Sequence, residues 1–184
     1  MDSILIQIIG FVGTGLILAS FQFRSAKVMF LMQGLGCVCF SVHFFLLGAY
    51  AGMALNLAGL VRGIVMAQAV QGKRWANHPA VRWTLPVLFL LAAIPSMSEG
   101  WRMVLPISGS FIETIAQIRK RPREIRLSKI LYCSPVWIVY NLMAHSISGA
   151  ITEVINMISV GISIARFGLD TMDMAEVAPK GAQE

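Results

Sequence analysis

The sequence predicts an all-α polytopic membrane protein with seven transmembrane helices, and three observations carry this prediction. Hydrophobic residues make up 57% of the 184 residues and charged residues only 13%, with a mean hydropathy of +0.72, which is too apolar for a soluble domain of this size. Apolar runs of about 17 to 22 residues, each long enough to cross a hydrocarbon core as a helix, recur along the chain. When the sequence is aligned with itself at an offset of 97 residues, the first three runs match the last three.

Each of the seven apolar runs is expected to be a helix that crosses the membrane once. The first is kept as a crossing and not read as a signal peptide, because Asp2 stands where a basic region is needed. The fourth is the shortest, and its Pro86 and Pro95 predict a tilted or kinked helix. The predicted crossings are residues 4–23, 28–48, 51–71, 82–97, 101–118, 127–146 and 148–167.

The repeat divides one membrane domain, residues 1–169, into two copies and a linker. Repeat one is 4–71, the linker helix is 82–97 and repeat two is 101–167, while the polar segment 170–184 is expected to be a disordered cytoplasmic tail. A unit of three crossings followed by one linker crossing starts its second copy from the same side as the first. The two repeats are therefore predicted to be parallel.

The distribution of Lys and Arg predicts the orientation. Thirteen of the 15 basic residues, Lys129 included, fall on one face, and only Arg102 falls on the other. The positive-inside rule then places the N-terminus outside and the C-terminus in the cytoplasm. The basic segment Arg119–Arg126 fits this topology signal and contact with anionic lipids better than nucleic-acid binding. The expected partner is the lipid bilayer, with no nucleic acid, and a homo-oligomer stays open.

Several segments resemble a known family. Val42–Tyr50, Leu105–Gly109 and Ile164–Phe167 are similar to the YgjV family of bacterial inner-membrane proteins, over about residues 30–167. The 3+1+3 arrangement resembles the SWEET and PQ-loop class of small transporters. These resemblances imply a bacterial inner-membrane location and a SWEET-like fold. The chain departs from the PQ-loop pattern, because Pro135 is followed by Val136 and the second crossing has no proline.

Arg62 lies near the middle of the third crossing, where an unpaired charge costs about 2.5 to 3.5 kcal/mol. It is therefore expected to face the interior and pair with an acid. Glu113 and Glu153 are the two acids inside predicted crossings, and Glu113 lies at nearly the depth of Arg62, whereas Glu153 lies roughly 9 Å nearer the outside. Pairing of Arg62 with Glu113 would leave Glu153 without a cation, and burial would then favour its protonated form. Glu153 is thus a candidate proton or cation site. The alternative is a static structural pair of Arg62 and Glu113, with Glu153 exposed to water near the outer mouth.

Three asparagines complete the candidate substrate-binding residues. Asn56 shares a face of the third crossing with three glycines, a pattern typical of close helix packing as well as of a lined cavity. Asn141 lies on the sixth crossing and Asn156 on the seventh. The SWEET-like resemblance implies a substrate pocket that contains an asparagine from the third and from the seventh crossing, and Asn56 and Asn156 are the candidates for this pair.

No pattern for an enzyme appears in the sequence. It has no His-Glu-x-x-His motif, no Gly-x-Ser-x-Gly motif and no phosphate-binding glycine loop. Cys37, Cys39 and Cys133 lie inside predicted crossings without the spacing of a metal site. We therefore expect a protein that is not an enzyme and that has no cofactor and no metal.

The favoured function is a membrane transporter or facilitator of a small polar solute, which crosses through a central cavity between two three-helix halves. The halves would rock to give alternating access. The alternative is a non-transporting structural or regulatory inner-membrane protein whose buried polar groups fix helix packing. A polar cavity at the level of Arg62 separates the two hypotheses, because a structural protein should be packed shut there.

Overall fold

The computed structural model describes residues 3–20, 26–92, 94–119 and 122–169, and within these ranges the chain forms helices and no strands. The predicted all-α class is confirmed, while the predicted tail at 170–184 lies outside the described residues. The elements are α1 (Ser3–Ser20), α2 (Ala26–Leu46), α3 (Tyr50–Ala69), α4 (Arg74–Asn77), α5 (Pro79–Leu91), the 3₁₀ segment η1 (Ile94–Met103), α6 (Val104–Arg119), α7 (Pro122–Ser128), the π-helical segment η2 (Lys129–Cys133), α8 (Ser134–Met143) and α9 (Ile147–Phe167).

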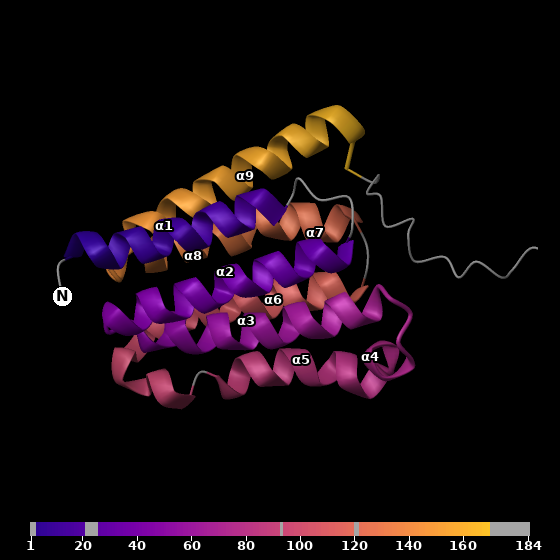
Figure 1. Ribbon diagram of the computed structural model, residues 1–184, viewed down its shortest axis with the longest axis horizontal. Coiled ribbons are helices and arrows are strands. Elements are labelled where there is room, and N and C mark those ends of the chain that lie inside the picture. The colour runs from indigo at the N-terminus through magenta and orange to yellow at the C-terminus, as the bar shows by residue number, and fades with distance from the viewer. Residues whose placement is uncertain (1–2, 21–25, 93, 120–121, 170–184) are drawn as a thin grey trace, which may run out of the picture.

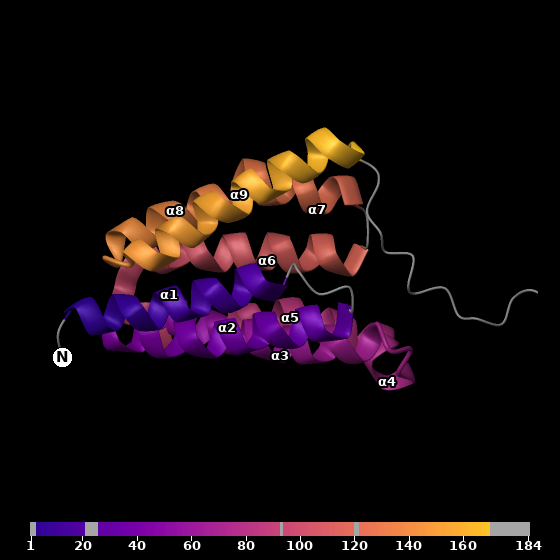
Figure 2. The same ribbon diagram turned by 45° about the horizontal axis from the view of Figure 1, so that its top comes forward.

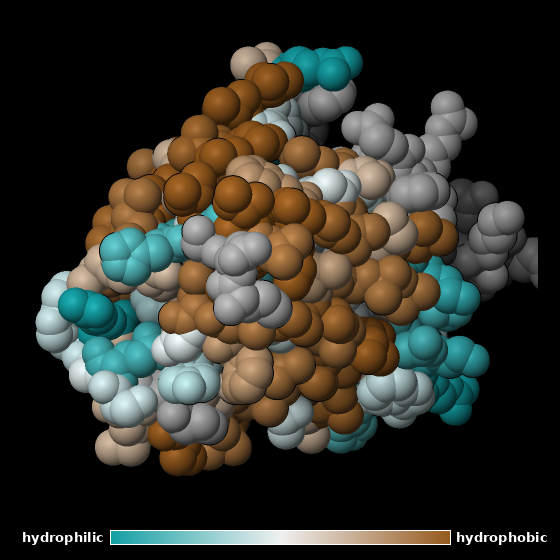
Figure 3. Space-filling view, turned by 60° about the vertical axis from the view of Figure 1, so that its left-hand side comes forward, coloured by the Kyte–Doolittle hydropathy of each residue, from teal (hydrophilic) through white to brown (hydrophobic). Residues whose placement is uncertain are grey.

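The long helices run side by side along the long axis of the molecule (Figure 1). Two of them, Tyr50–Ala69 and Ile147–Arg166, are long and apolar enough to cross a membrane, and shorter apolar helices cover Ile4–Ser20, Phe30–Leu46 and Pro79–Leu91. The space-filling view shows a broad hydrophobic surface over the helices, with hydrophilic residues gathered toward its edges (Figure 3). An apolar belt between polar edges is the surface that a bilayer requires.

Two segments differ from the predicted crossings. The fourth was expected at 82–97, but α5 ends at Leu91 and the chain continues as η1, in which Gly100 has a positive φ of 60°. The sixth was expected to be one helix, and it consists of α7, η2 and α8 in succession. Proline explains the second difference, because Pro135 has no N–H to donate to the preceding turn.

The helices of each half pack in the same order. In the first half α2 packs between α1 and α3, and in the second half the segment formed by α7, η2 and α8 packs between α6 and α9. Between the halves, α1 contacts α9 and α3 contacts α6. Figure 2 shows α8 and α9 on one side of α6 and the first three helices on the other.

Two tight turns lie at the same end of the molecule, which we call the tight-turn end (residues 47–49 and 144–146). Gly48 in the first turn has φ 72°, and His145 in the second has φ 55°. The N–H of Ala49 donates to the carbonyl five residues earlier at 2.9 Å, and the N–H of Ser146 does the same at 2.8 Å. The turn residues correspond under the shift of 97 residues that the sequence predicted.

The opposite end carries most of the basic side chains and is called the basic end here. It contains the start of α2, the segment from α3 through α4 to α5, the end of α6 and the end of α9 (Figure 1). An aromatic and apolar cluster closes the tight-turn end instead, and it consists of Phe40, Phe44, Ala49, Ala51 and Tyr140. The two ends of the helix bundle therefore differ: most of the basic side chains lie at one end, and a packed aromatic cluster closes the other.

Candidate functional site

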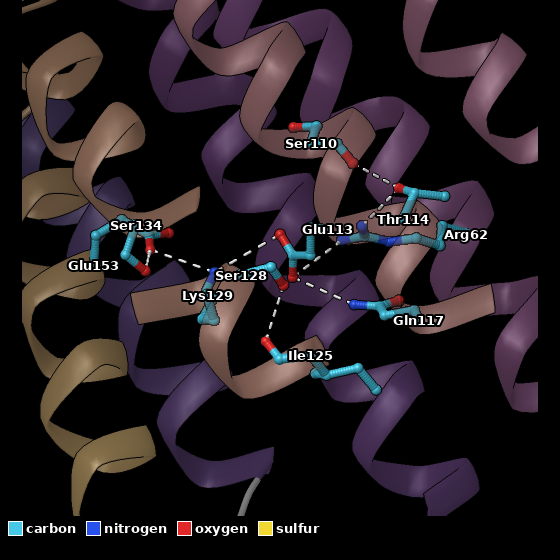
Figure 4. Close-up of polar contacts among 10 residues, drawn as sticks. All are labelled: Arg62, Ser110, Glu113, Thr114, Gln117, Ile125, Ser128, Lys129, Ser134 and Glu153. Atoms are coloured by element: carbon cyan, nitrogen blue, oxygen red, sulfur yellow. Dashed lines mark hydrogen bonds and ion pairs between the residues drawn. The ribbon is translucent and has the colours of Figure 1, made fainter. Parts of the chain in front are cut away.

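Arg62 projects from α3 toward α6, about 18 Å along α3 from Tyr50. Its Nη1 donates a hydrogen bond to the Thr114 hydroxyl at 3.0 Å, and its guanidinium lies 5.2 Å from the ring centroid of Phe89, a cation–π distance. Its Nη2 lies 3.9 Å from Glu113 Oε1 (Figure 4). The expected pairing of Arg62 with Glu113 is therefore present, with a separation longer than a hydrogen bond.

Glu113 is shared between two cations. Its Oε2 lies 3.7 Å from Lys129 Nζ, while its Oε1 faces Arg62 and accepts a hydrogen bond from the Gln117 amide at 3.3 Å. Gln117 follows Glu113 by one helical turn, so α6 itself orients the carboxylate. Glu113 thus joins α3 to the middle segment of the second half.

Lys129 is the residue that the sequence prediction misplaced. It was counted with the basic residues of the cytoplasmic face, but the structure places its side chain between α6 and α9, seven residues inside the segment that begins at Pro122. The N–H of Ser134 donates to the carbonyl of Lys129, an i to i−5 bond that defines the π turn. Because Pro135 cannot donate, the wider turn accommodates it. The predicted crossing began at 127, and this was the available signal that Lys129 is internal.

Glu153 was expected to lack a cation, and this expectation is wrong. Its Oε2 lies 3.4 Å from Lys129 Nζ and accepts a hydrogen bond from the Ser134 hydroxyl at 2.6 Å (Figure 4). The depth argument failed because it considered only Arg62 as a cation. Lys129 is therefore the cation of Glu153, from the segment that precedes α8.

The four charged side chains form one chain in the order Arg62, Glu113, Lys129 and Glu153. Two positive and two negative charges sum to zero, so the group carries no net charge to desolvate inside the bundle. Each side chain keeps between 14% and 20% of its surface exposed. The group is therefore buried enough to need its partners.

A cavity of about 60 Å³ adjoins the Arg62 end of this chain. It lies between the two halves, since α2 and α3 supply most of its wall and α6 supplies the rest. Gly59 and Gly63 allow the close approach of α2 and α3 beside it, because a Cβ at Gly63 would lie 3.2 Å from the Phe30 carbonyl oxygen. The lining residues are Phe30, Gln33, Gly34, Cys37, Gly59, Arg62, Gly63, Met66, Glu113 and Gln117.

The three candidate asparagines lie away from this cavity. The Asn56 amide donates to the Gly52 carbonyl at 2.8 Å, within its own helix. Asn141 is 2% exposed at the tight-turn end, beside Gly149, and its Oδ1 has no hydrogen-bond partner. Asn156 lies on α9 and is half-buried, and it is not among the lining residues. Of the six candidates, the structure brings together Arg62, Glu113 and Glu153.

A second polar group joins the halves at the tight-turn end. The buried His43 of α2 donates from Nδ1 to the Ile6 carbonyl at 2.8 Å, so its Nε2 accepts from the Ser146 hydroxyl at 2.8 Å. Gln7 of α1 donates to the His145 carbonyl and accepts from the Ser148 N–H. These contacts tie the first half to the start of α9.

A matching group ties the second half to the start of α3. The Tyr140 hydroxyl donates to Glu99 at 3.1 Å and accepts from the N–H of Gly52 at 2.8 Å. Glu99 also accepts from the N–H of Ala51. Tyr140 and His43 correspond under the shift of 97 residues, and each reaches the first turn of the third helix of the other half.

The described part of the chain contains no group of three His, Cys, Asp or Glu side chains placed to hold a metal ion. Its chemistry is that of hydrogen bonds and ion pairs between helices.

An all-helical molecule with an apolar belt and a charged chain between its helices has the architecture of an all-α membrane protein. The model of the Imp-YgjV family, described as bacterial inner membrane protein, matches residues 4–171, and the chain belongs to this family. A comparison with curated proteins found no match, and a comparison with solved structures found none. The resemblance to the YgjV family is confirmed by this match.

Proposed function

We propose that this inner-membrane protein is a transporter or facilitator of a small polar solute, with a SWEET-like fold of two parallel three-helix repeats joined by a linker helix. The observation that carries the proposal is the cavity at the level of Arg62, walled by helices of both halves. A protein whose charged groups served only helix packing has no need of accessible space beside them.

The parallel repeat draws support from the two turns and from the packing. Gly48 and His145 share a positive φ, and the hydrogen bonds around them correspond one to one. In the repeat, α1 corresponds to α6 and α3 corresponds to α9. The contact of α1 with α9 therefore corresponds to the contact of α6 with α3, as a two-fold axis along the helices requires. An axis in that direction is the one expected for parallel repeats.

The difference between the two ends supports alternating access as the proposed mechanism. The tight-turn end is closed by the Phe40 cluster and by the hydrogen bonds of His43 and Tyr140. The cavity lies toward the basic end, since Phe30, Met66 and Gln117 lie within the first or last two turns of their helices there. The described arrangement is then the state closed toward the tight-turn end, and rocking of the halves would open it.

A cross-link across the halves tests this mechanism. Thr14 of α1 and Thr152 of α9 share a buried hydrogen bond with a 2.6 Å separation of their hydroxyl oxygens. In a variant whose three native cysteines are replaced by alanine, Thr14→Cys with Thr152→Cys should form a disulfide under a mild oxidant. Uptake of radiolabelled solutes by proteoliposomes should stop on oxidation and return on reduction.

The single-cysteine variants are the matched controls, and their uptake should not respond to oxidant. The solute panel contains polyols, monosaccharides, amino acids and short carboxylates. Uptake that continues through the cross-linked protein would overturn rocking. No uptake of any solute above empty liposomes, from protein that remains folded, would favour the structural alternative.

A further inference from the structure

We infer that the cavity beside Arg62 binds a small zwitterion, an amino acid of about five or six non-hydrogen atoms, through its carboxylate on Arg62 and its ammonium on Glu113. This inference rests on the proposed function and names the class of solute that the site takes.

The position of Arg62 at the end of the charge chain is the first step. Glu113 and Lys129 each have two oppositely charged neighbours, whereas Arg62 has Glu113 and Glu153 has Lys129. The terminal negative charge, on Glu153, also accepts the Ser134 hydroxyl bond. The terminal positive charge, on Arg62, faces the cavity. A solute therefore meets an arginine whose charge is only partly compensated.

The stretched pair of Arg62 and Glu113 is the second step. Charge-assisted hydrogen bonds between such groups are normally about 2.7 to 2.9 Å long, and this pair is separated by 3.9 Å. A guanidinium has five N–H donors, and the structure gives that of Arg62 one side-chain hydrogen bond, to Thr114. Both members of the pair line the cavity. The pair thus has donors and acceptors available to a solute that enters between them.

Charge balance selects the zwitterion over a simple anion or cation. The four charges of the site sum to zero, so a bound carboxylate alone would leave a net negative charge in a medium of low dielectric constant. A bound ammonium alone would leave a net positive charge. A zwitterion replaces one ion pair by two and keeps the sum at zero.

The size and the remaining lining agree with this class. A volume of about 60 Å³ holds roughly four to six water molecules, which is close to the size of glycine or alanine and too small for a hexose. The amide of Gln33, whose Nε2 lies 3.4 Å from the Ser20 hydroxyl, lines the same space and adds a donor for the carboxylate. Phe30 and Met66 offer apolar surface for a short side chain.

Binding to the purified full-length protein in nanodiscs, measured by titration calorimetry, tests the inference. Glycine, alanine and β-alanine should bind saturably, and propionate and ethylamine, which each carry one of the two charges, should bind at least about tenfold more weakly. Equal binding of propionate or of ethylamine would overturn the zwitterion. Binding of glucose or glycerol with no binding of the amino acids would overturn it as well.

Variants connect the binding to the site. Arg62→Gln with Glu113→Gln keeps two amides in place of the ion pair, so that no buried charge is left without a partner, and it should weaken glycine binding at least about tenfold. Arg82→Gln is the matched control, because Arg82 contacts the Ile118 carbonyl and neither residue lines the cavity, and glycine binding should be unchanged. Glycine binding that persists in the folded double variant would refute the site.

The experiments distinguish failure of the transport proposal from failure of the zwitterion inference. Glycine binding without uptake by proteoliposomes would sustain this inference and remove the transport function. Uptake of polyols without glycine binding would sustain transport and remove this inference.

Discussion

At the scale of single residues, the position of Lys129 decides how the site works. Its ammonium is the only contact in the described residues that joins Glu113 of α6 to Glu153 of α9. Without it, two carboxylates would lie inside the bundle with a single cation, Arg62, at 3.9 Å from one of them. Lys129 therefore holds the second half together electrostatically as well as completing the charge balance.

Removing this cation should be the most costly of the single changes. Lys129→Met is expected to lower the free energy of unfolding by about 3 to 5 kcal/mol, because a buried carboxylate loses its partner. Lys129→Met with Glu153→Gln should recover much of that loss, since Glu113 keeps Arg62 and no unpaired acid remains. Thermal unfolding in detergent measures both.

The exposed Lys73 supplies the control for the charge itself, and Lys73→Met should change stability by no more than about 0.5 kcal/mol. A double variant as unstable as the Lys129→Met single variant would show that Glu153 does not depend on Lys129.

The sequence alone favoured Arg62 with Glu113, and this pair is present. The sequence alone could not place Lys129. Its proximity to the basic cluster indicated the cytoplasmic face, whereas the start of the predicted crossing at residue 127 indicated the interior of the bundle.

At the scale of elements, proline and glycine determine where the helices deviate. Pro106 is the third residue of α6, where a missing N–H breaks no helical bond, so it does not disrupt the helix. Pro135 instead follows the π turn that directs Lys129 inward. Helix existence could be predicted from apolar periodicity, whereas the π turn could not, because its register depends on packing around Pro135 and not on hydropathy.

The tight turns give a prediction in which alanine at two different glycines changes stability in opposite directions. Gly48 has φ 72° and open space where a Cβ would be, so Gly48→Ala introduces backbone strain alone and should destabilise the protein by about 1 kcal/mol. Gly15 also has open space, but it lies inside α1, and Gly15→Ala should stabilise the protein by about 0.5 to 1 kcal/mol. The shift in unfolding temperature should have opposite signs for the two variants. The same sign for both would mean that the Gly48 turn lacks this conformation.

At the scale of the whole molecule, the two ends of the bundle differ in their content of basic residues, and this difference predicts the orientation of the protein in the membrane. Of the thirteen basic residues assigned to one face from the sequence, Lys129 proves internal, which leaves twelve against Arg102 alone on the other. Removing Lys129 lowers the count by one, and the majority of the basic residues stays on the same face. The lengths of the apolar runs could be read from the sequence, while the cavity could not, because it arises from three helices that meet only in the folded chain.

Orientation is the prediction that belongs to this scale. Under the positive-inside rule the basic end faces the cytoplasm and the tight-turn end faces outward. Ser98 in η1 and Lys73 before α4 are both exposed, and they lie at opposite ends. Starting from the protein without native cysteines, Ser98→Cys should react with a membrane-impermeant maleimide in intact spheroplasts, and Lys73→Cys should react only after lysis. Both variants should react in detergent, which controls for burial. Labelling of Lys73→Cys in intact spheroplasts would reverse the orientation, and the state closed at the tight-turn end would then open toward the outside rather than toward the cytoplasm.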